Sequence, residues 1–486
     1  MRRLRRAAWL SLALLSVFTM VAGLAVAHML PGRLALWRLP TVASRGLAQA
    51  GPVLGPVPET QISGTAHTGK AGQLMTAAGV TAALNGVLAS PALGPHVGAV
   101  VEDLSTGQLL LSRGGASAFA PASTAKLAVA TAALAVLGPS AHLTTKVVAG
   151  PTPSSIVLVG GGDPTLAVNR FPAADYPQPA TLASLAGQTA RALRAKGVRA
   201  VHLRYDTSLF TGPGLAPGWP AGYVTTGNVT PIQSLEVDQG RLTPGGAPED
   251  SDDPGNFRPR TFTPAADAAQ AFASLLAARG IRVLGPAVQA GAGRGRSQLA
   301  AVSSPPLAEI IQQMLTESNN VIAENLARQV AIATRRPASF SGGAAAETAV
   351  LRRLGVGGIS LVDGSGLSPQ DRITPDTLVQ LVRMAASRGH PQFRPVITGL
   401  PVAGFTGTLA PGGSVFNDLG QPALGVVRAK TGNLTTVVSL AGIAYARNGQ
   451  LLAFAFMADR LPKGALDTAG DDLTRLATSL AACGCR

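Results

Sequence analysis

Apolar residues recur at helical spacing in several long segments of the chain. They stand three and four residues apart, which places them on one face of a helix. The segments with this pattern are 73–89, 307–332, 374–386 and 465–482. Short apolar runs bounded by turn residues predict strands at 96–104, 108–112, 425–429, 437–446 and 451–457. Tight turns at 105–107 and 447–449 join neighbouring strands, so we expect a mixed α/β core with an antiparallel sheet edge.

The middle of the chain, residues 144–302, has a different pattern. Glycine-rich and Pro/Gly turns at 160–166 and 211–222 interrupt it. The predicted strands cover 147–148, 155–159, 198–206, 232–237 and 281–284, and the predicted helices cover 180–197 and 265–280. This alternation predicts a separate α/β domain inserted into the core.

The N-terminus has the pattern of an export segment. Four arginines within residues 1–6 precede 21 uncharged residues, 7–27. That stretch is either a signal peptide cleaved after Ala27 or an uncleaved membrane anchor. Both readings place the rest of the chain outside the cytoplasm, in the periplasm or the extracytoplasmic envelope. The following residues, 28–71, lack periodicity and predict a flexible linker.

Composition limits the choice of partner and compartment. The 486 residues suggest two or three domains, and the net charge of +15 favours an anionic cell-envelope surface. No basic run with interleaved aromatic residues follows the N-terminus, so we expect no nucleic acid. The two cysteines, Cys483 and Cys485, are too few for a structural zinc site. A tail disulfide, a lipid attachment and an inert pair remain open, and we favour the inert pair.

Ser123 and Lys126 form the first chemical motif. Three residues apart at the start of an apolar helical run, they share one face. A serine hydroxyl becomes a nucleophile when a base takes its proton, and a lysine of lowered pKa can be that base. Lysine is scarce, with six among 40 basic residues. Ser-x-x-Lys alone also fits an ordinary helix start.

Two further motifs follow in order along the chain. They are Ser318-x-Asn320, within a helical pattern, and Lys430-Thr431-Gly432, at the end of a strand. Together with Ser123-x-x-Lys126 they resemble the three motifs of penicillin-interacting serine enzymes. The separation of 195 positions from Ser123 to Ser318 leaves room for the insert.

Other stretches narrow the resemblance to one family. They are Gly160–Leu166, Tyr205–Phe210, Pro217-x-Trp219, Asp363–Ser368 and Gly404–Leu409. With the three motifs they resemble the class C low-molecular-mass penicillin-binding proteins, the DacB-type D-alanyl-D-alanine carboxypeptidase/endopeptidases. The resemblance covers roughly 73–482.

The resemblance implies an α/β (α+β) fold. A β-lactamase/transpeptidase-like catalytic domain, an antiparallel sheet flanked by helices, would span 72–145 and 296–482. The insert of 146–295 would lie between the first and second motifs, after the export segment and linker.

The resemblance also implies a mechanism without metal or organic cofactor. Ser123 would attack the carbonyl between the two terminal D-alanines of a peptidoglycan stem peptide, and β-lactam antibiotics would inhibit by acylating it. The other implied roles are Lys126 as base, Ser318 as proton relay, Asn320 as holder of the substrate amide and of Lys126, and Lys430 and Thr431 as binders of the terminal carboxylate. The backbone N–H groups of Ser123 and Asn433 would form the oxyanion hole, and Gly432 would also line the substrate site. Asn433 stands where a threonine is frequent, which affects a side-chain contact only.

Two other functions compete with this one. A serine β-lactamase would use the same nucleophile with faster deacylation, and the large insert argues against it. A non-catalytic wall-binding protein would use only the basic surface, and it would never label with penicillin. A histidine-dependent triad is disfavoured because none of the six histidines lies in a motif.

Overall fold

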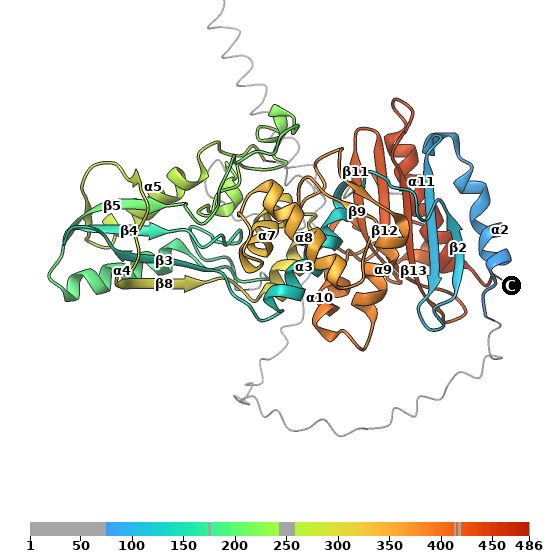
Figure 1. Ribbon diagram of the computed structural model, residues 1–486, viewed down its shortest axis with the longest axis horizontal. Helices are drawn as coiled ribbons and strands as arrows, with labels where there is room; N and C mark the ends of the chain where they lie inside the picture. Colours follow the sequence, from blue (N-terminus) through green and yellow to red (C-terminus); the bar gives the residue numbers. More distant parts are fainter. Residues whose placement is uncertain (1–73, 174–175, 243–257, 413–414, 417–418, 486) are drawn as a thin grey trace, which may run out of the picture. The chain divides into compact units, whose positions relative to one another are not determined.

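The structure is a computed structural model that describes residues 74–173, 176–242, 258–412, 415–416 and 419–485 (Figure 1). The predicted export segment, 1–27, and linker, 28–71, lie outside the described residues. Within those ranges, no helix has the length and apolar character needed to cross a membrane.

A five-stranded antiparallel sheet is the centre of the part of the described chain that lies outside the predicted insert (Figure 1). Its spatial order is β11-β12-β13-β1-β2. The strands are β1 (Val97–Asp103), β2 (Leu109–Arg113), β11 (Val427–Leu434), β12 (Val437–Tyr445) and β13 (Leu451–Ala458). The two hairpins predicted from the sequence therefore join through β13 and β1, which pair from Val97 with Ala458 to Asp103 with Leu452.

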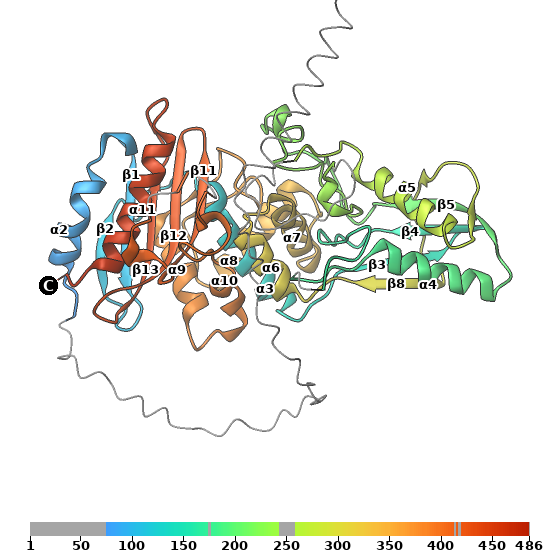
Figure 2. The same cartoon turned by 180° about the vertical axis from the view of Figure 1, so that it is seen from behind.

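Helices cover both faces of this sheet (Figures 1 and 2). Side chains alternate along β13, so Phe454 and Phe456 join one core while Ala455 and Met457 join the other. The first core holds α2 (Ala77–Leu88) and α11 (Leu466–Ala482). The second holds α3 (Lys126–Leu137), α6 (Leu307–Thr316), α7 (Asn320–Ala333), α8 (Phe340–Arg353), α9 (Pro375–Ala386) and α10 (Arg394–Thr398).

Short elements complete the described chain. A two-stranded ladder pairs β9 (Ile359–Ser360) with β10 (Arg372–Ile373). The 3-10 turns are η1 (Pro91–Leu93), η2 (Ala122–Ala125), η3 (Ala221–Tyr223), η4 (Asp238–Gly240), η5 (Pro391–Phe393), η6 (Gly407–Leu409) and η7 (Gln421–Ala423). Two of these turns, η3 and η4, belong to the predicted insert.

The inserted segment has its own mixed sheet and core. The spatial order is β6-β5-β4-β3-β8, with β7 also paired to β5. The strands are β3 (Thr144–Ala149), β4 (Ser155–Val159), β5 (Ala200–Asp206), β6 (Arg282–Val283), β7 (Val288–Gln289) and β8 (Gln298–Ser303), and the helices are α4 (Leu182–Ala195) and α5 (Pro264–Ala277). Strands β3 and β8 lie where the chain enters and leaves the predicted insert.

The structure corrects two predicted elements and adds a helix that was not predicted. Residues 232–237 form no strand, since Ile232 N–H bonds the carbonyl of Gly214 and Ser234 C=O accepts from Gly162, both in loops. The single helix predicted over 307–332 is two helices, α6 and α7, with a break at 317–319. Helix α8 was not predicted, because its sequence is rich in glycine and alanine and shows a weak apolar stripe.

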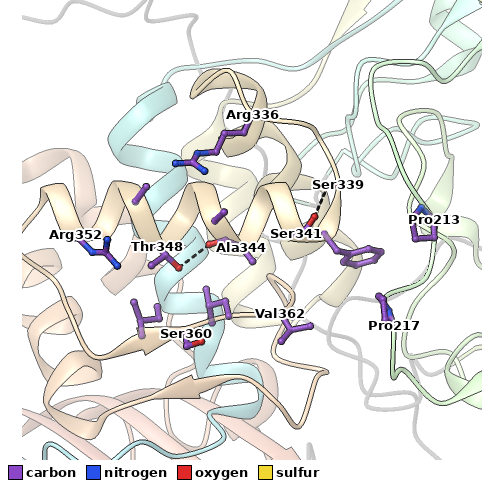
Figure 3. A pocket seen from close by; sticks show the side chains of 15 residues that line it. Pro213, Pro217, Arg336, Ser339, Ser341, Ala344, Thr348, Arg352, Ser360 and Val362 are labelled. Carbon is purple, nitrogen blue, oxygen red and sulfur yellow. Dashed lines mark hydrogen bonds between the residues drawn. The ribbon is translucent and has the colours of Figure 1, made fainter.

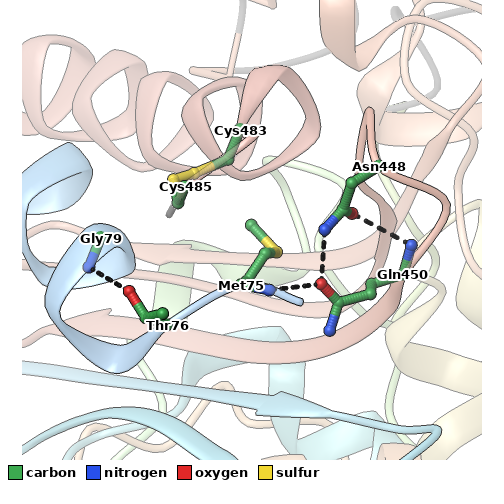
Figure 4. The surroundings of a disulfide bond; sticks show 7 residues. All are labelled: Met75, Thr76, Gly79, Asn448, Gln450, Cys483 and Cys485. Atoms are coloured by element: carbon green, nitrogen blue, oxygen red, sulfur yellow. Dashed lines mark hydrogen bonds between the residues drawn. A yellow bond between two sulfur atoms is a disulfide. The ribbon is translucent and has the colours of Figure 1, made fainter. Parts of the chain in front are cut away.

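The two cysteines are not an inert pair. Cys483 and Cys485 form a disulfide just beyond α11 (Figure 4). The carbonyl of Cys485 accepts a hydrogen bond from the N–H of Thr76, at 3.1 Å. Thr76 caps the start of α2, since its hydroxyl accepts from the N–H of Gly79. The tail therefore lies against the first helix that packs beside α11.

Candidate active site

Ser123 lies on η2, one turn before the long buried helix α3. The preceding residue, Ala122, has a left-handed φ of 47°. A strand residue holds this turn, because the Ser439 hydroxyl donates to the carbonyl of Pro121 at 2.5 Å. Gly366 crosses so close that a Cβ there would lie 1.9 Å from the Ala122 carbonyl oxygen. The turn that presents Ser123 is thus held by segments far away in sequence.

Lys126 is fully buried and makes three contacts through its Nζ atom. Nζ lies 2.9 Å from Ser123 Oγ, 2.7 Å from Asn320 Oδ1 and 2.8 Å from the carbonyl oxygen of Ser365. Burial lowers the pKa of Lys126 to about 7, and the negative charges of Asp363 and Glu324 act in the opposite direction. A substantial fraction of this lysine is therefore neutral at physiological pH, as a general base requires.

Asn320 begins α7, and the break before this helix carries Ser318. Ser318 has a left-handed φ of 57°. The Asn320 amide is oriented from two sides, because its Nδ2 donates to the carbonyl of Asn228 at 2.9 Å while Oδ1 accepts from Lys126. Among the described residues, no hydrogen bond joins Ser318 to Ser123 or Lys126. The second motif is thus joined to Lys126 through Asn320, which stands two residues after Ser318.

The third motif lies inside β11, beside the nucleophile turn. Lys430 is fully buried, and its Nζ donates to the carbonyl of Thr431 at 2.9 Å. Burial and the charge of Lys126 hold the pKa of Lys430 well below its usual range. The Thr431 hydroxyl pairs with that of Thr408 at 2.6 Å.

Gly432 brings the backbone of β11 against Ser123. A Cβ on Gly432 would lie 2.9 Å from the Ser123 nitrogen and 2.8 Å from the Pro121 carbonyl oxygen. Only glycine permits this approach. Asn433 follows with an exposed side chain while its backbone pairs with Val438. The backbone N–H groups of residues 123 and 433 therefore lie on neighbouring segments.

The structure adds site residues to which sequence reasoning gave no role. In the turn 363–368, the Asp363 carboxylate accepts from the N–H groups of Gly366 and Ser368, each at 2.7 Å. Asp363 Oδ2 also accepts from the Trp219 indole at 2.8 Å. Ser365 contributes its carbonyl, not its hydroxyl, to Lys126. Both Trp219 and Asn228 belong to the predicted insert, so the insert reaches the site.

Replacing Trp219 with phenylalanine is expected to destabilise the protein. Asp363 is fully buried, and the variant leaves its Oδ2 with one donor fewer while keeping the ring that packs on Phe340. A hydrogen bond to a charged group contributes about 1.5–3 kcal/mol. Urea unfolding measures the loss. The control is Tyr223→Phe, on the neighbouring ring. An unchanged free energy of unfolding in Trp219→Phe would contradict this role.

A separate surface pocket lies along α8 (Figure 3). Its volume is about 710 Å³, and Arg336, Arg352 and Val362 are among the residues that line it. None of the lining residues belongs to the three motifs. Within the described ranges, no three His, Cys, Asp or Glu side chains are grouped to hold a metal ion.

Comparisons with known proteins match both parts of the chain. The family model of the D-Ala-D-Ala carboxypeptidase 3 (S13) family matches residues 80–257 and 243–480. A carboxypeptidase of Mycobacterium tuberculosis is 39% identical over 445 residues, which are 89% of this chain and 90% of that protein. Carboxypeptidase DacB of Mycolicibacterium smegmatis is 37% identical over 434 residues, which are 88% of this chain and 90% of that protein.

Solved structures show the same fold. Penicillin binding protein 4 of Haemophilus influenzae is similar with a TM-score of 0.64 and 21% identity, covering 82% of this chain and 98% of that one. The structure of that protein with a novel β-lactam gives a TM-score of 0.59 at the same identity and coverage. The predicted β-lactamase/transpeptidase-like α/β fold is thereby confirmed.

Proposed function

This chain belongs to the D-Ala-D-Ala carboxypeptidase 3 (S13) family, and from that premise we propose that Ser123 is its acylated nucleophile. The predicted enzyme class, a serine-type D-Ala-D-Ala carboxypeptidase, is confirmed by this membership. The observation that carries the proposal is the 2.9 Å contact between Lys126 Nζ and Ser123 Oγ. The substrate is a peptidoglycan stem peptide ending in D-Ala-D-Ala.

The contacts of Lys126 explain why it acts as the base. A neutral amine has two N–H groups and one electron pair. Asn320 Oδ1 and the Ser365 carbonyl are both acceptors facing Nζ, since the Asn320 amide nitrogen is bonded to Asn228. They take the two N–H groups, so the electron pair faces the Ser123 hydroxyl. Lys126 then accepts that proton as Oγ attacks the carbonyl carbon.

The oxyanion of the resulting intermediate needs donors close to Ser123. We assign this role to the N–H groups of Ser123 and Asn433, because Gly432 brings β11 against the nucleophile turn. One such donor contributes ~3 kcal/mol to transition-state stabilisation. Lys430 and Thr431, on the same strand, bind the free terminal carboxylate.

The leaving D-alanine needs a proton as its amine departs. Ser318 relays this proton from Lys126, and Asn320 holds the substrate amide. Water then attacks the ester on Ser123 while Lys126 accepts a proton from it. Lys126 passes this proton to Ser123 Oγ as the acyl bond breaks, so the lysine is neutral and the serine hydroxyl is restored. Carboxypeptidase action releases a terminal D-alanine, whereas endopeptidase action would cut a cross-link by the same steps.

Mass spectrometry tests the proposal directly. The protein is incubated with a stem pentapeptide and with benzylpenicillin in separate samples. We expect release of one D-alanine per pentapeptide, and a penicilloyl adduct on the peptide that contains Ser123. An adduct on another residue would overturn the assignment of the nucleophile. Rapid turnover of penicillin without a lasting adduct would favour the serine β-lactamase.

We also propose that the chain works outside the cytoplasm, where it meets anionic envelope polymers. The support is a cluster of cations, here called the basic end, where α4 and α5 terminate beside the start of β5 and β6. The Arg194 side chain bonds the Arg279 carbonyl at 2.6 Å, and Ala200 pairs with Arg282. Its members are Arg191, Arg194, Lys196, Arg199, Arg279 and Arg282. The segments that carry these residues, 182–205 and 268–291, contain no Asp or Glu that could neutralise the positive charge.

Neutralising the basic end is expected to weaken binding to purified cell-wall fragments. The variant replaces Arg191, Arg194 and Arg199 with glutamine, and sedimentation measures binding at two salt concentrations. We expect the parent to lose affinity as salt rises and the variant to lose that dependence. The control neutralises Arg352, Arg353 and Arg388, which are also exposed, so that net charge is equal. Equal effects of the two triple variants would refute a specific basic end.

A further inference from the structure

A buried carboxylate holds the turn that contacts Lys126. Glu324 is fully buried, and its Oε1 accepts hydrogen bonds from the N–H groups of Gly364, at 3.0 Å, and Ser365, at 2.8 Å. On the other side, Asp363 Oδ1 accepts from the N–H of Gly366 at 2.7 Å. Ser365 is therefore fixed at both of its peptide bonds. Its carbonyl is the one that faces Lys126 Nζ.

Two residues of helix α7 act on Lys126, one directly and one through the turn. Asn320 accepts directly from Nζ, and Glu324 follows four residues later on the same face. Glu324 reaches the lysine through Ser365 rather than by contact. Arg328 is next along that face, where its Nη1 lies 3.6 Å from Glu324 Oε2 and its guanidinium lies over the Phe340 ring at 4.1 Å. This neighbour keeps the Glu324 carboxylate turned toward the 363–366 turn.

Several charged groups face Glu324 from the elements packed around it. Arg328 lies on its own helix, Asp363 on the turn, Lys126 on α3 and Glu347 on α8. Burial and Asp363 raise the pKa of Glu324, while Arg328 opposes this shift. Burial and three neighbouring carboxylates, those of Glu324, Asp371 and Asp363, raise the pKa of Glu347 well above its usual range.

We propose that Glu324 is a positioning residue that, through the Ser365 peptide, directs the electron pair of Lys126 toward the Ser123 hydroxyl. This proposal rests on the proposed function, in which Lys126 is the base. If the Ser365 carbonyl moves, one N–H of Lys126 loses its acceptor. The amine is then free to rotate, and its electron pair no longer faces Oγ in most molecules. Acylation slows although Ser123, Lys126 and the substrate contacts are intact.

Two conservative variants separate bond geometry from charge. Glu324→Asp keeps the charge but retracts the carboxylate by about 1.5 Å, the length of one bond. Glu324→Gln keeps an acceptor at the original place but loses the charge. Stopped-flow acylation of the full chain by a chromogenic cephalosporin gives the binding constant and the acylation rate constant separately. We expect acylation to fall ~10–100-fold in Glu324→Asp, with binding unchanged, and to stay within about threefold in Glu324→Gln.

The pH dependence of the acylation rate is a second measurement. A residue with only a structural role would not change it. The Glu324 charge favours protonated Lys126, so its removal lowers the lysine pKa. The acid limb of the acylation profile should move to lower pH in Glu324→Gln and remain in place in Glu324→Asp. The matched control is Glu347→Gln, a buried acid that accepts no hydrogen bond from the described residues. We expect the acylation rate constant of Glu347→Gln to lie within about twofold of the parent value.

The outcomes are distinguishable. A larger loss in Glu324→Gln than in Glu324→Asp would show that charge rather than bond geometry matters, and would overturn the proposal. Parent rates in both variants would overturn it as well. A parent chain that is never acylated would instead overturn the proposed function, and this inference with it.

Discussion

Replacing Ser123 with alanine is expected to abolish covalent labelling by fluorescent penicillin and the release of D-alanine. The hydroxyl oxygen is the atom that forms the acyl bond. None of the other groups that contact Lys126 can replace it as a nucleophile. Among the described residues, the only other serine that contacts Lys126 is Ser365, and the contact is made by its backbone carbonyl. Labelling followed by gel fluorescence measures the loss, expected to exceed ~1000-fold in acylation rate.

The fold should be unaffected by this change. Ser123 is only partly buried, and its recorded side-chain partner is Lys126, so we expect a shift in the free energy of unfolding of about 1 kcal/mol or less. The matched control is Ser365→Ala, which removes a serine hydroxyl nearby but leaves the carbonyl that holds Lys126. That variant should retain labelling. Labelling that survives in Ser123→Ala, or disappears in Ser365→Ala, would contradict the assignment.

The sequence was sufficient to predict the elements that carry local signals. Strands β1, β2, β12 and β13 were predicted from apolar runs bounded by Ser-Thr-Gly and Asn-Gly turns, and they lie within a few residues of the predicted positions. Helices α9 and α11 were predicted from their apolar stripes. These signals are local because a hairpin turn or a helix face is determined by residues close together in sequence.

Other features depend on tertiary contacts that no local pattern encodes. The break between α6 and α7 has Ser318 in a left-handed conformation. The polar residues 316–320 interrupt the apolar pattern at this point, but they fit an exposed or cleft-facing turn of a single helix as well as a break. Strand β11 extends through Lys430 to Leu434, so the third motif lies within a strand rather than at its end. β11 and β12 form a hairpin in which Leu434 pairs with Val437. Its two turn residues, Thr435 and Thr436, lack the glycine or asparagine that typically marks such a turn in a sequence.

The site itself was only partly predictable. The three motifs identified Ser123, Lys126, Asn320 and Lys430, but not the groups that hold them. The carbonyl of Ser365 lies 239 residues from Lys126, and a backbone atom leaves no trace in residue identity. The sequence did carry a signal for Glu324, since it stands four residues after Asn320 and therefore on the same helix face as this motif residue. The structure brings Ser123, Lys126, Asn320 and Lys430 together. The roles assigned to these residues, and to Ser318, Thr431, Gly432 and Asn433, stay predictions.

Replacing Lys126 with arginine is expected to slow acylation about 10³-fold or more. Arginine keeps the positive charge and the capacity to donate to Asn320 and Ser365, but it does not release a proton at physiological pH. It therefore has no electron pair for the Ser123 proton. A positioned general base contributes about 10²–10⁴-fold to rate, so the loss should match the removal of that step. Stopped-flow acylation by a chromogenic cephalosporin measures it.

The pH dependence of the parent shows whether Lys126 is the titrating base. Burial lowers its pKa to about 7, and the neutral amine is the active form. The parent's acylation rate should therefore rise as the pH passes through about 7, because the fraction of neutral Lys126 increases there. The residual rate of Lys126→Arg should lack this limb. Arginine is larger than lysine and could disturb the packing of the buried site, so Lys126→Met serves as a second variant. It removes the charge without adding bulk and should be equally slow. A parent-like limb near pH 7 in either variant would mean that another group takes the proton from Ser123.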